Sequence, residues 1–335
     1  MSEFRQEITT GEWTIIAAGR ARRPTDFKST DSSTLPSFEK TCPFCPGQEY
    51  MTPPDVLRYP EEGGGAGWSM RGFVNKFPIL SPEPPFEPTI IDGHFLKRGG
   101  AGVHEVLVET PRHNGFVPSR SVEEILLMLK AYRQRYLARR EKWLGGVMII
   151  FKNEGASAGA SIIHPHSQLL VTSLIPPMIE AKLRIAKQYF EDSSRCLYRE
   201  IEQWENESKS RLVLRTEQFT VFNPYASRTP FETCIVPRSD TASFADMSQN
   251  EMEELARVLL DVMGRFYRIF RTPDFNWIIY TTPYGEENRK DFIWHLQIQP
   301  RLTVLGGFEM AGGMFVNVVR PEDAAAVLRE AESTA

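Results

Sequence analysis

The chain has no long apolar run, few cysteines and little net charge, and each of these features argues against a class of protein. No segment approaches the roughly eighteen apolar residues of a membrane-spanning helix, and residues 1–16 lack the basic and apolar regions of a secretory signal. Lysine and arginine number 39 against 43 aspartates and glutamates, so the formal net charge of −4 gives no overall attraction to nucleic acid or membranes. We therefore expect a cytoplasmic protein that binds neither and that meets any anionic ligand locally.

Cysteine is scarce, with four residues among 335. This number, and the pairing of two of them in Cys42-Pro-Phe-Cys45, fit a reducing compartment better than a disulfide framework. Two cysteines separated by two residues can present thiolates to one metal ion, but the pair is only half a zinc site and is also compatible with a redox pair. Cys196 and Cys234 stand alone, and we interpret them as small buried hydrophobic residues.

The stretch with the clearest chemical pattern is residues 152–172, KNEGASAGASIIHPHSQLLVT. His164, His166 and Gln168 occupy alternate positions, which places them on one face if the segment is an extended strand. The preceding loop, residues 155–161, consists of glycine, alanine and serine, and such a loop can bring backbone N–H groups close to an anion. The pattern predicts that a phosphate is delivered to a histidine.

Periodicity and capping signals predict alternating strands and helices. Strands are expected at residues 12–18, 70–78, 104–109 and 147–151, and the segment 104–109 alternates polar with apolar residues as a half-buried strand does. Ser121 and Glu124 form a capping box, which opens a helix that extends to about Trp143. The basic segment 19–24, GRARRP, is compatible with a solvated surface turn or with an arginine clamp for phosphate.

The second half of the chain repeats the order of the first. Landmarks recur at separations of 127 to 129 residues: Glu105 and Glu232, Ser121 and Ser248, and His166 and His295. Residues 293–297 correspond to residues 164–168, but the second copy has lost its first histidine. The repeat predicts an α+β fold of two tandem units with antiparallel sheets and crossing helices, related by a pseudo-twofold axis. We assign them to residues 1–195 and 196–335, with a helical, charged linker at about 179–210.

Five ordered blocks carry a family resemblance: CPFCPG, FVNKFP, GVHEVLVETPRH, KNEGASAGASIIHPHSQ and FIWHLQIQPRLT. With these blocks the sequence resembles the galactose-1-phosphate uridylyltransferase branch of the histidine-triad superfamily over nearly the whole chain. HPHSQ alone would be only suggestive, whereas five blocks in order and an internal repeat are highly specific.

The resemblance implies a structural zinc site with a nucleophile beside it. Zinc would be bound by Cys42, Cys45, His113 and His164, and four protein ligands leave no open position for water. His166 would attack the α-phosphorus of a nucleoside diphosphate sugar, form a covalent nucleotidyl-histidine and release sugar 1-phosphate. A second sugar phosphate would then accept the nucleotide, with no obvious need for magnesium or a redox cofactor.

The resemblance also assigns residues to the substrate. Gln168 would be the catalytic partner that contacts the phosphate, and the remaining substrate-binding positions would be Arg20, Arg23, Asn75, Asn153, Gly159, Ser161, Phe308 and Glu309. We interpret His94 and His104 as hydrogen-bonded core residues, because neither lies in a site motif. His295 replaces the nucleophile in the second repeat, and with Ile293 and Gln297 beside it the second metal site of some relatives is expected to be absent.

Two departures from the family pattern bear on the substrate. Ser167 stands where better-known transferases have glycine, and the segment 306–315 lacks a glutamine of their hexose-binding segment and is similar to relatives that act on ADP-glucose. We expect a homodimer that moves UMP between hexose 1-phosphates, from UDP-glucose to galactose 1-phosphate. The alternatives are an ADP-glucose phosphorylase or dinucleoside polyphosphate phosphorylase that uses the same histidine, and a zinc-stabilised nucleotide-binding protein without activity.

Overall fold

The structure, a computed structural model, describes residues 2–20, 35–60, 67–83, 89–91 and 93–331, and for residues 20 and 89–91 only the backbone. Its strands, in chain order, are β1 (Glu3–Gln6), β2 (Trp13–Ile16), β3 (Asp55–Pro60), β4 (Trp68–Val74), β5 (Thr89–Ile91), β6 (Phe95–Lys97), β7 (Gly102–Val108), β8 (Val147–Glu154), β9 (His166–Thr172), β10 (Leu212–Arg215), β11 (Phe219–Phe222), β12 (Thr233–Pro237), β13 (Phe275–Tyr280), β14 (His295–Pro300) and β15 (Phe315–Asn317). Its α-helices are α1 (Val122–Arg140), α2 (Pro177–Ser193), α3 (Leu197–Ser208), α4 (Gln249–Phe270), α5 (Gly307–Gly312) and α6 (Pro321–Glu330). Short 3-10 turns are η1 (Ala18–Arg20), η3 (Glu49–Met51), η4 (Val117–Ser119), η5 (Glu141–Trp143), η6 (Ala156–Ala158) and η7 (Phe244–Asp246).

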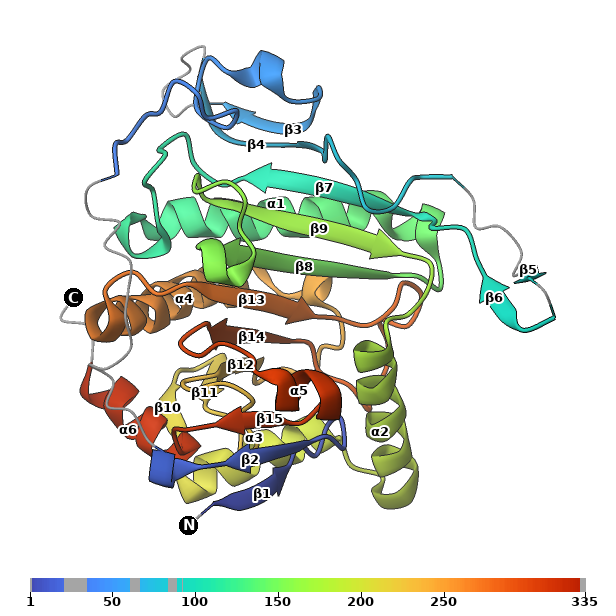
Figure 1. Ribbon diagram of the computed structural model, residues 1–335, viewed down its shortest axis with the longest axis vertical. Helices are drawn as coiled ribbons and strands as arrows, with labels where there is room; N and C mark the ends of the chain where they lie inside the picture. The colour runs from blue at the N-terminus through green and yellow to red at the C-terminus, as the bar shows by residue number, and fades with distance from the viewer. Residues whose placement is uncertain (1, 21–34, 61–66, 84–88, 92, 332–335) are drawn as a thin grey trace.

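One antiparallel sheet runs through both halves of the described chain (Figure 1). Its ten strands lie in the order β10-β11-β12-β14-β13-β8-β9-β7-β4-β3. The order is symmetric about the central pair, in which β13 lies antiparallel to β8 with Phe275 opposite Glu154 and Ile279 opposite Ile150. This symmetry confirms the predicted α+β fold of two related units, whose sheets join edge to edge into one.

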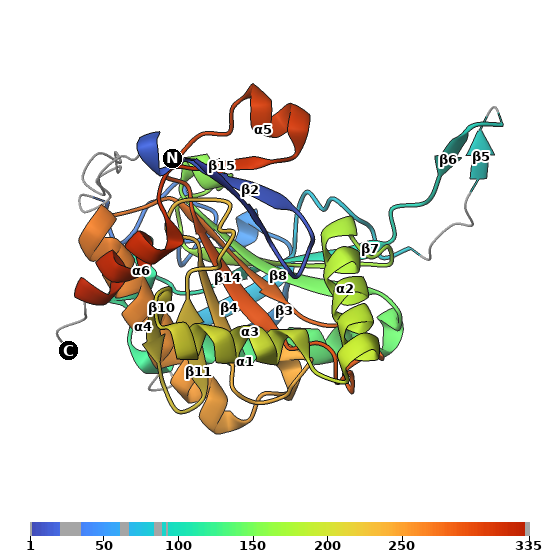
Figure 2. The same ribbon diagram turned by 90° about the horizontal axis from the view of Figure 1, so that it is seen from below.

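The two crossing helices cover the same face of this sheet. Both α1 and α4 begin with the predicted capping boxes, at Ser121 and Ser248. Figure 2 shows these helices on one side of the sheet and the small β1-β2-β15 sheet with α5 on the other. Apolar residues of both helices and of the sheet form one continuous core, which includes Leu129, Ile150, Leu169, Leu259 and Trp277. Burial of each large side chain contributes about 1.5–3 kcal/mol, so this core fixes the sheet on which the site lies.

Three sequence-based predictions about local structure need correction. β9 begins at His166, so His164 lies just before the strand, because Pro165 has no N–H to donate to a strand partner. β7 is buried along its whole length instead of on one face, because the α1 core covers one side and the cluster around Cys42 and Cys45 covers the other. α1 ends at Arg140, and the turn η5 contains the residues up to Trp143.

The predicted helical linker is present as α2 and α3, and the proposed unit boundary after residue 195 falls in the turn between them. Cys234 is buried and Cys196 is half-buried at the start of α3, and both have free thiols. Within the residues that the structure describes, no helix is long and apolar enough to cross a membrane.

Candidate active site and metal centre

The four residues predicted to bind zinc lie together at the start of β9. Cys42, Cys45, His113 and His164 are buried, and their ligand atoms all lie within 4.8 Å of one another. The Sγ atom of Cys45 is 3.5 Å from Nδ1 of both histidines, and the Sγ atom of Cys42 is 3.8 Å from Nδ1 of His164. Tetrahedral zinc, with bonds of about 2.3 Å to sulfur and about 2.0 Å to nitrogen, holds sulfur and nitrogen about 3.5 Å apart. The cluster therefore has the size and donor set of a Cys2His2 metal site.

The protonation of the cluster also suits a metal ion. The Nε2–H group of His164 donates to the carbonyl of Thr110 at 2.7 Å, which leaves the lone pair of Nδ1 directed at the cysteines. Burial lowers the pKa of His164 to about 3, so this imidazole is neutral at pH 7. Burial raises the pKa of Cys45 to about 11, so its thiolate requires a cation beside it. A bound metal ion would supply that charge and tie the cysteine segment to β9.

His166 has the tautomer that a nucleophilic imidazole requires. Its Nδ1–H group donates to the carbonyl of His164 at 2.8 Å, so Nε2 carries the lone pair and has no hydrogen-bond partner among the described residues. Burial lowers the pKa of His166, which keeps the imidazole neutral, and the side chain is only 6% exposed. Phe44, between the two cysteines, packs edge-on against the ring with centroids 5.1 Å apart. Sequence analysis missed Phe44, although its position inside the Cys-x-x-Cys pair was the available signal.

Gln168 forms a hydrogen bond with His104, for which the sequence predicts only a place in the core. His104 is buried as predicted, but its Nε2 atom lies 2.8 Å from Oε1 of Gln168. The amide nitrogen of Asn75 lies 3.3–3.4 Å from the two ring nitrogens of His104. Asn75 also accepts the N–H of Phe77 at 2.9 Å, as a turn residue does. The structure thus brings two predicted site residues, Asn75 and Gln168, to one unpredicted histidine.

The small-residue loop does not present the free backbone amides that its composition suggested. The N–H and hydroxyl groups of Ser157 both donate to Asp274, at 2.7 and 2.6 Å, and the N–H groups of residues 158–160 donate to carbonyls within the loop. Gly155 has φ of +84°, and a Cβ atom there would lie 1.8 Å from the Asp274 carboxylate. The geometry therefore explains the glycine by its contact with Asp274, and a phosphate cradle made of the amides 157–160 is not supported.

Three predicted phosphate contacts lie on or next to this loop. Gly159 ends η6 with φ of +86°, and Asn153 accepts a hydrogen bond from Asn276 of β13 at 2.8 Å. The hydroxyl-bearing Ser161 is exposed. The Ser161 hydroxyl and the amide NH2 of half-buried Asn153 have no acceptor among the described residues, and their contact with a phosphate stays a prediction.

The other predicted substrate contacts are not joined to His166 in the described chain. Phe308 and Glu309 lie on α5, which follows β14 in the chain, and two strands separate β14 from β9 in the large sheet. The carboxylate of Glu309 caps the N–H of Gly306 at 2.9 Å. The side chain of Arg20 and all of Arg23 lie outside the described residues, so their roles stay predictions.

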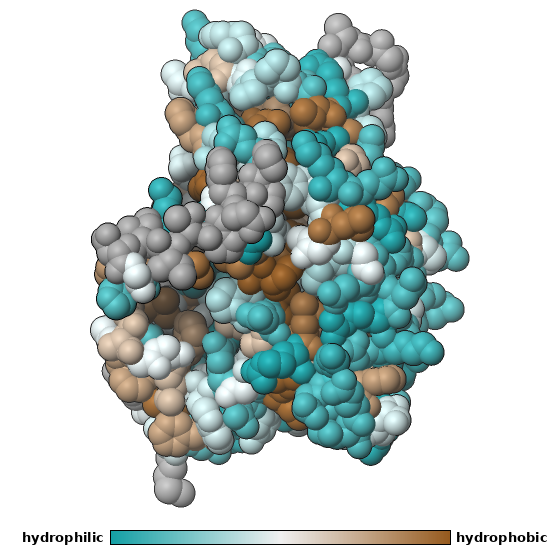
Figure 3. Space-filling view, turned by 90° about the vertical axis from the view of Figure 1, so that its right-hand side faces the viewer, coloured by the Kyte–Doolittle hydropathy of each residue, from teal (hydrophilic) through white to brown (hydrophobic). Residues whose placement is uncertain are grey.

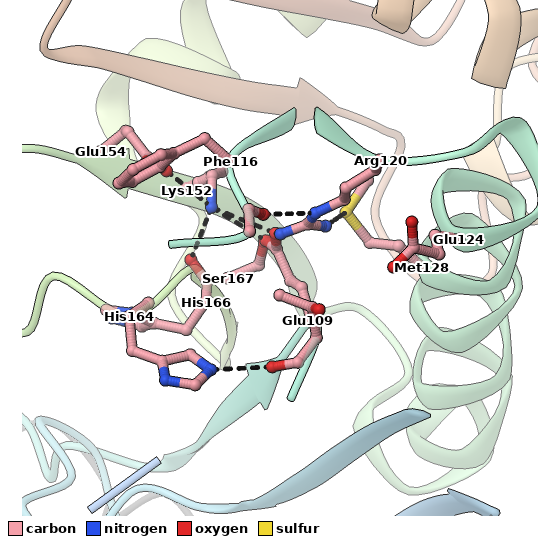
Figure 4. Close-up of polar contacts among 12 residues, drawn as sticks. Glu109, Phe116, Arg120, Glu124, Met128, Lys152, Glu154, His164, His166 and Ser167 are labelled. Atoms are coloured by element: carbon pink, nitrogen blue, oxygen red, sulfur yellow. Dashed lines mark hydrogen bonds and ion pairs between the residues drawn. The ribbon is translucent and has the colours of Figure 1, made fainter. Parts of the chain in front are cut away.

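Buried charged residues lie directly behind His166, on the α1 side of β9 (Figure 4). The Lys152 ammonium contacts the carboxylates of Glu109 and Glu154 at 3.1 and 2.9 Å and donates to the carbonyl of His166 at 3.4 Å. Arg120 donates to Glu109 at 2.7 Å. Burial by itself raises the pKa of Glu109, but the charges of Lys152 and Arg120 lower it to about 2. This balanced group of charges holds the backbone of His166 in place.

We expect Lys152→Met to lower the free energy of unfolding by about 3–5 kcal/mol, because the change leaves buried Glu154 without its cation and Glu109 with Arg120 alone. Lys187→Met is the control, since Lys187 forms only an exposed pair with Glu191. Urea unfolding at pH 7 measures both variants. A loss no larger for Lys152 than for Lys187 would contradict the role of the network.

The same network predicts how stability depends on pH. The pKa of Glu109 is lower in the folded than in the unfolded chain, so its ionised form stabilises the fold fully above the ordinary carboxyl pKa, and this contribution disappears as the pH falls toward about 2. In Lys152→Met the acid-dependent loss should be smaller. Urea unfolding measured between pH 5 and pH 2.5 tests the difference, and equal slopes in the two proteins would contradict it.

Ser167 faces away from the substrate side of β9. Its hydroxyl donates to Glu109 and contacts the hydroxyl of Tyr132 on α1, and the residue is fully buried. Successive residues of a strand point to opposite faces, so His166 and Gln168 lie on the other side. The presence of serine in place of glycine therefore cannot select the sugar by direct contact.

We accordingly expect Ser167→Gly to leave the ratio of kcat/KM for UDP-glucose and ADP-glucose unchanged. The variant should be less stable by about 1–2 kcal/mol, because it removes a buried hydrogen bond to Glu109 and introduces glycine into a strand. Thermal unfolding and steady-state kinetics on both donors measure the two effects. A shift in donor preference would show that the serine acts on the substrate.

The second repeat contains a cavity of about 360 Å³ in the position that corresponds to the site. His295 lines it, and its Nδ1–H group donates to the carbonyl of Ile293 at 3.1 Å, as the Nδ1–H of His166 does to His164. The Nε2 atom of His295, however, accepts a hydrogen bond from the buried ammonium of Lys182 at 3.3 Å. The lone pair is covered, so His295 cannot act as a second nucleophile.

Two repeated units that share one sheet, with His166 at the start of the interior strand β9, are the arrangement of a nucleotidyltransferase with a histidine-triad-like fold. Residues 1–176 match the family model for the N-terminal domain of galactose-1-phosphate uridyl transferase, and residues 182–334 match the model for its C-terminal domain. The chain therefore belongs to the galactose-1-phosphate uridyl transferase family.

Characterised relatives carry out two related reactions. The chain is 32% identical to the ADP-glucose phosphorylase of Arabidopsis thaliana, over 99% of this chain and 93% of the relative. It is 28% identical to the galactose-1-phosphate uridylyltransferase of Thermotoga maritima, over 99% of both chains. The crystal structure of the Arabidopsis phosphorylase with bound ADP-glucose superposes with a TM-score of 0.81 at 29% identity, over 98% of this chain and 99% of that one. Nucleotidyl transfer is common to these relatives and is the reaction class of this chain.

Proposed function

We propose that the protein transfers UMP from UDP-glucose to galactose 1-phosphate through a covalent intermediate on His166. The observation that carries the proposal is the Nε2 lone pair of His166, which accepts no hydrogen bond from the described residues. The imidazole is neutral, and its Nδ1–H donates to the His164 carbonyl. A binding protein has no need of a nucleophile in that state. Uridylyltransferases of this family recur across species, which supports the choice of donor.

In the first step Nε2 of His166 attacks the α-phosphorus, a nitrogen–phosphorus bond forms, and the bond to the oxygen of glucose 1-phosphate breaks. The positive charge that develops on the ring is stabilised by the Nδ1–H bond to the His164 carbonyl. In the second step a phosphate oxygen of galactose 1-phosphate attacks the same phosphorus and His166 leaves. The amide of Gln168 and the hydroxyl of Ser161 would donate to the non-bridging oxygens, where charge increases in the transition state.

We further propose that the Cys2His2 cluster binds zinc and that its role is structural. Two thiolates and two imidazoles are a donor set that zinc prefers, and four protein ligands complete its coordination. Zinc would fix Phe44 and His164, which both contact His166. We assign Arg20, Arg23 and Asn75 to the nucleotide, and Asn153, Gly159, Phe308 and Glu309 to the phosphates and sugar.

A second candidate function is phosphorolysis of ADP-glucose with the same histidine. The relative with 32% identity is an ADP-glucose phosphorylase, and its structure contains ADP-glucose. In that case His166 would carry AMP, and an inorganic phosphate would replace the sugar phosphate as acceptor. A dinucleoside polyphosphate phosphorylase would also use the same histidine on a different donor.

The donor is identified by covalent labelling. The protein is incubated with UDP-glucose or ADP-glucose that carries ³²P in the α-phosphate, denatured and digested, and the labelled peptide is sequenced. We expect label from UDP-glucose on His166. Label from ADP-glucose alone would replace the first candidate by the second, and no label from either would overturn both.

We also propose that the protein is a cytoplasmic homodimer. The hairpin of β5 and β6 projects from the body of the molecule (Figures 1 and 2), and Phe77, Ile79, Phe95 and Leu96 on and before it are 67–80% exposed. Figure 3 shows the surface on this side as mostly hydrophilic with apolar atoms gathered in a band. Exposed apolar groups of this kind are typical of protein contacts. Light scattering after size-exclusion chromatography should give twice the mass of the chain, and a monomer mass would contradict the proposal.

A further inference from the structure

We infer that His104 is a positioning residue for nucleotidyl transfer: its imidazole N–H holds the amide oxygen of Gln168, so that the amide NH2 faces the phosphate at His166. The inference deepens the proposed function and rests on it. Gln168 lies two residues after the nucleophile on the same face of β9, so the orientation of its amide decides whether it offers the substrate a donor or an acceptor.

The neighbours of His104 define which ring nitrogen carries the proton. The backbone N–H of Ile79 points to Nδ1 at 3.4 Å, so Nδ1 has to be the acceptor. Nε2 lies 2.8 Å from Oε1 of Gln168, and because an amide oxygen only accepts, Nε2 has to be the donor. Both contacts are satisfied together by one neutral tautomer, with the proton on Nε2. In this tautomer the amide nitrogen of Asn75, 3.4 Å from Nδ1 and 3.3 Å from Nε2, can donate only to the lone pair of Nδ1.

This tautomer leaves one end of the Gln168 amide free. Its oxygen is occupied by His104, whereas its NH2 group has no acceptor among the described residues. The side chain is partly exposed on the face that carries His166. A donor fixed in this way can stabilise charge on a phosphate oxygen without reorganisation during the reaction. If the amide turned over, its oxygen would face the phosphate and repel it.

The second repeat shows the opposite arrangement. Val106 pairs with Gln168 and Cys234 pairs with Gln297, so His104 and Glu232 occupy equivalent positions two residues earlier. The strand pairing thus corrects the match of Glu105 with Glu232 that the sequence separation suggested, by one residue. Glu232 accepts a hydrogen bond from the amide nitrogen of Gln297, which turns that amide the other way. In the first repeat His104 donates to the glutamine, and Nε2 of His166 accepts no hydrogen bond from the described residues. In the second repeat Glu232 accepts from the glutamine, and Nε2 of His295 accepts a hydrogen bond from Lys182.

The kinetic test is a double-mutant cycle. It measures the rate at which the nucleotidyl-enzyme forms at saturating UDP-glucose that carries ³²P in the α-phosphate. We expect His104→Leu to slow this step roughly 10- to 100-fold, the scale of a misplaced catalytic group, with little change in KM. His104→Gln, which can still donate, should recover much of the rate, and His104→Glu should be as slow as His104→Leu or slower. In a Gln168→Ala background, His104→Leu should have no further effect, because His104 acts through Gln168. Additive losses, or a fast His104→Glu variant, would overturn the inference.

An independent test does not require activity. The chain has six histidines, so ¹⁵N-histidine NMR can assign each ring, with His104→Gln as the reference for assignment. We expect His104 to be neutral and protonated on Nε2 at pH 7, and this proton to exchange faster in Gln168→Leu. Protonation on Nδ1, or an unchanged proton in Gln168→Leu, would overturn the inference. A wild-type protein with the expected tautomer but without labelling would refute the proposed function and leave the His104–Gln168 contact established.

Discussion

Replacement of His166 by glycine is expected to lower the exchange of labelled glucose 1-phosphate into UDP-glucose by roughly 10⁴-fold or more, the scale on which covalent enzymes lose rate without their nucleophile. The physical reason is that Nε2 of His166 makes the bond to phosphorus, and no neighbouring group presents an equivalent lone pair. The fold should persist, because the side chain contributes one hydrogen bond and the contact with Phe44.

The matched control is His94→Gly, the same change at an exposed histidine outside the site. It should exchange at the wild-type rate. Circular dichroism and metal content establish that both variants are folded. Exchange by His166→Gly within tenfold of the wild-type rate would exclude a covalent intermediate on this residue. Absence of exchange in the wild-type protein, with nucleotide binding intact, would favour a binding protein without activity.

Cys42→Ser and Cys45→Ser are each expected to lose most of the bound zinc and to lower the melting temperature by about 5–10 °C. The four ligands come from segments far apart in the sequence, so metal binding is coupled to their folding, and loss of one thiolate is expected to remove several kcal/mol of stability. The rate of nucleotidyl transfer per folded molecule should change little, because His166 retains its hydrogen bond to the His164 carbonyl.

Cys196→Ser is the control for both cysteine variants, since Cys196 is half-buried and lies outside the cluster. Inductively coupled plasma mass spectrometry measures the zinc content per chain, and differential scanning calorimetry measures the melting temperature. Normal zinc content in both Cys42→Ser and Cys45→Ser would refute the assignment of the cluster. If the wild-type protein contained a different metal, the cluster would remain a metal site, and the assignment of the ion as zinc would be wrong.

The helix starts and the internal repeat followed from the sequence. The capping boxes at Ser121 and Ser248 depend only on residues within one helical turn, and both helices begin where these residues predict. The internal repeat predicted two related units, because equivalent sequences form equivalent elements, and the symmetric strand order confirms it. The HPHSQ motif identified His166 because the residue types needed for the chemistry are adjacent in the chain.

The sequence also produced the four residues of the metal cluster, but only through the resemblance to a family. Cys42 and Cys45 alone left a zinc site and a redox pair open, since nothing local connects them with His113 and His164. The structure brings these residues within 4.8 Å of one another. It also shows that His164 precedes β9, so the predicted alternation along one strand holds for His166 and Gln168 and not for His164.

The tertiary structure decided what lies behind and beside the nucleophile. Alternation along β9 showed that Ser167 and Gln168 point to opposite faces, but not which face α1 covers. Pairing of β9 with β7 made that decision, and it placed His104 against Gln168 and Glu109 against Ser167. Such contacts join residues about sixty positions apart, and strand pairing and helix packing, which depend on the whole chain, determine them. The sequence by itself therefore determined the reaction class and predicted His166 as the nucleophile, while the structure determined how His166 and Gln168 are held.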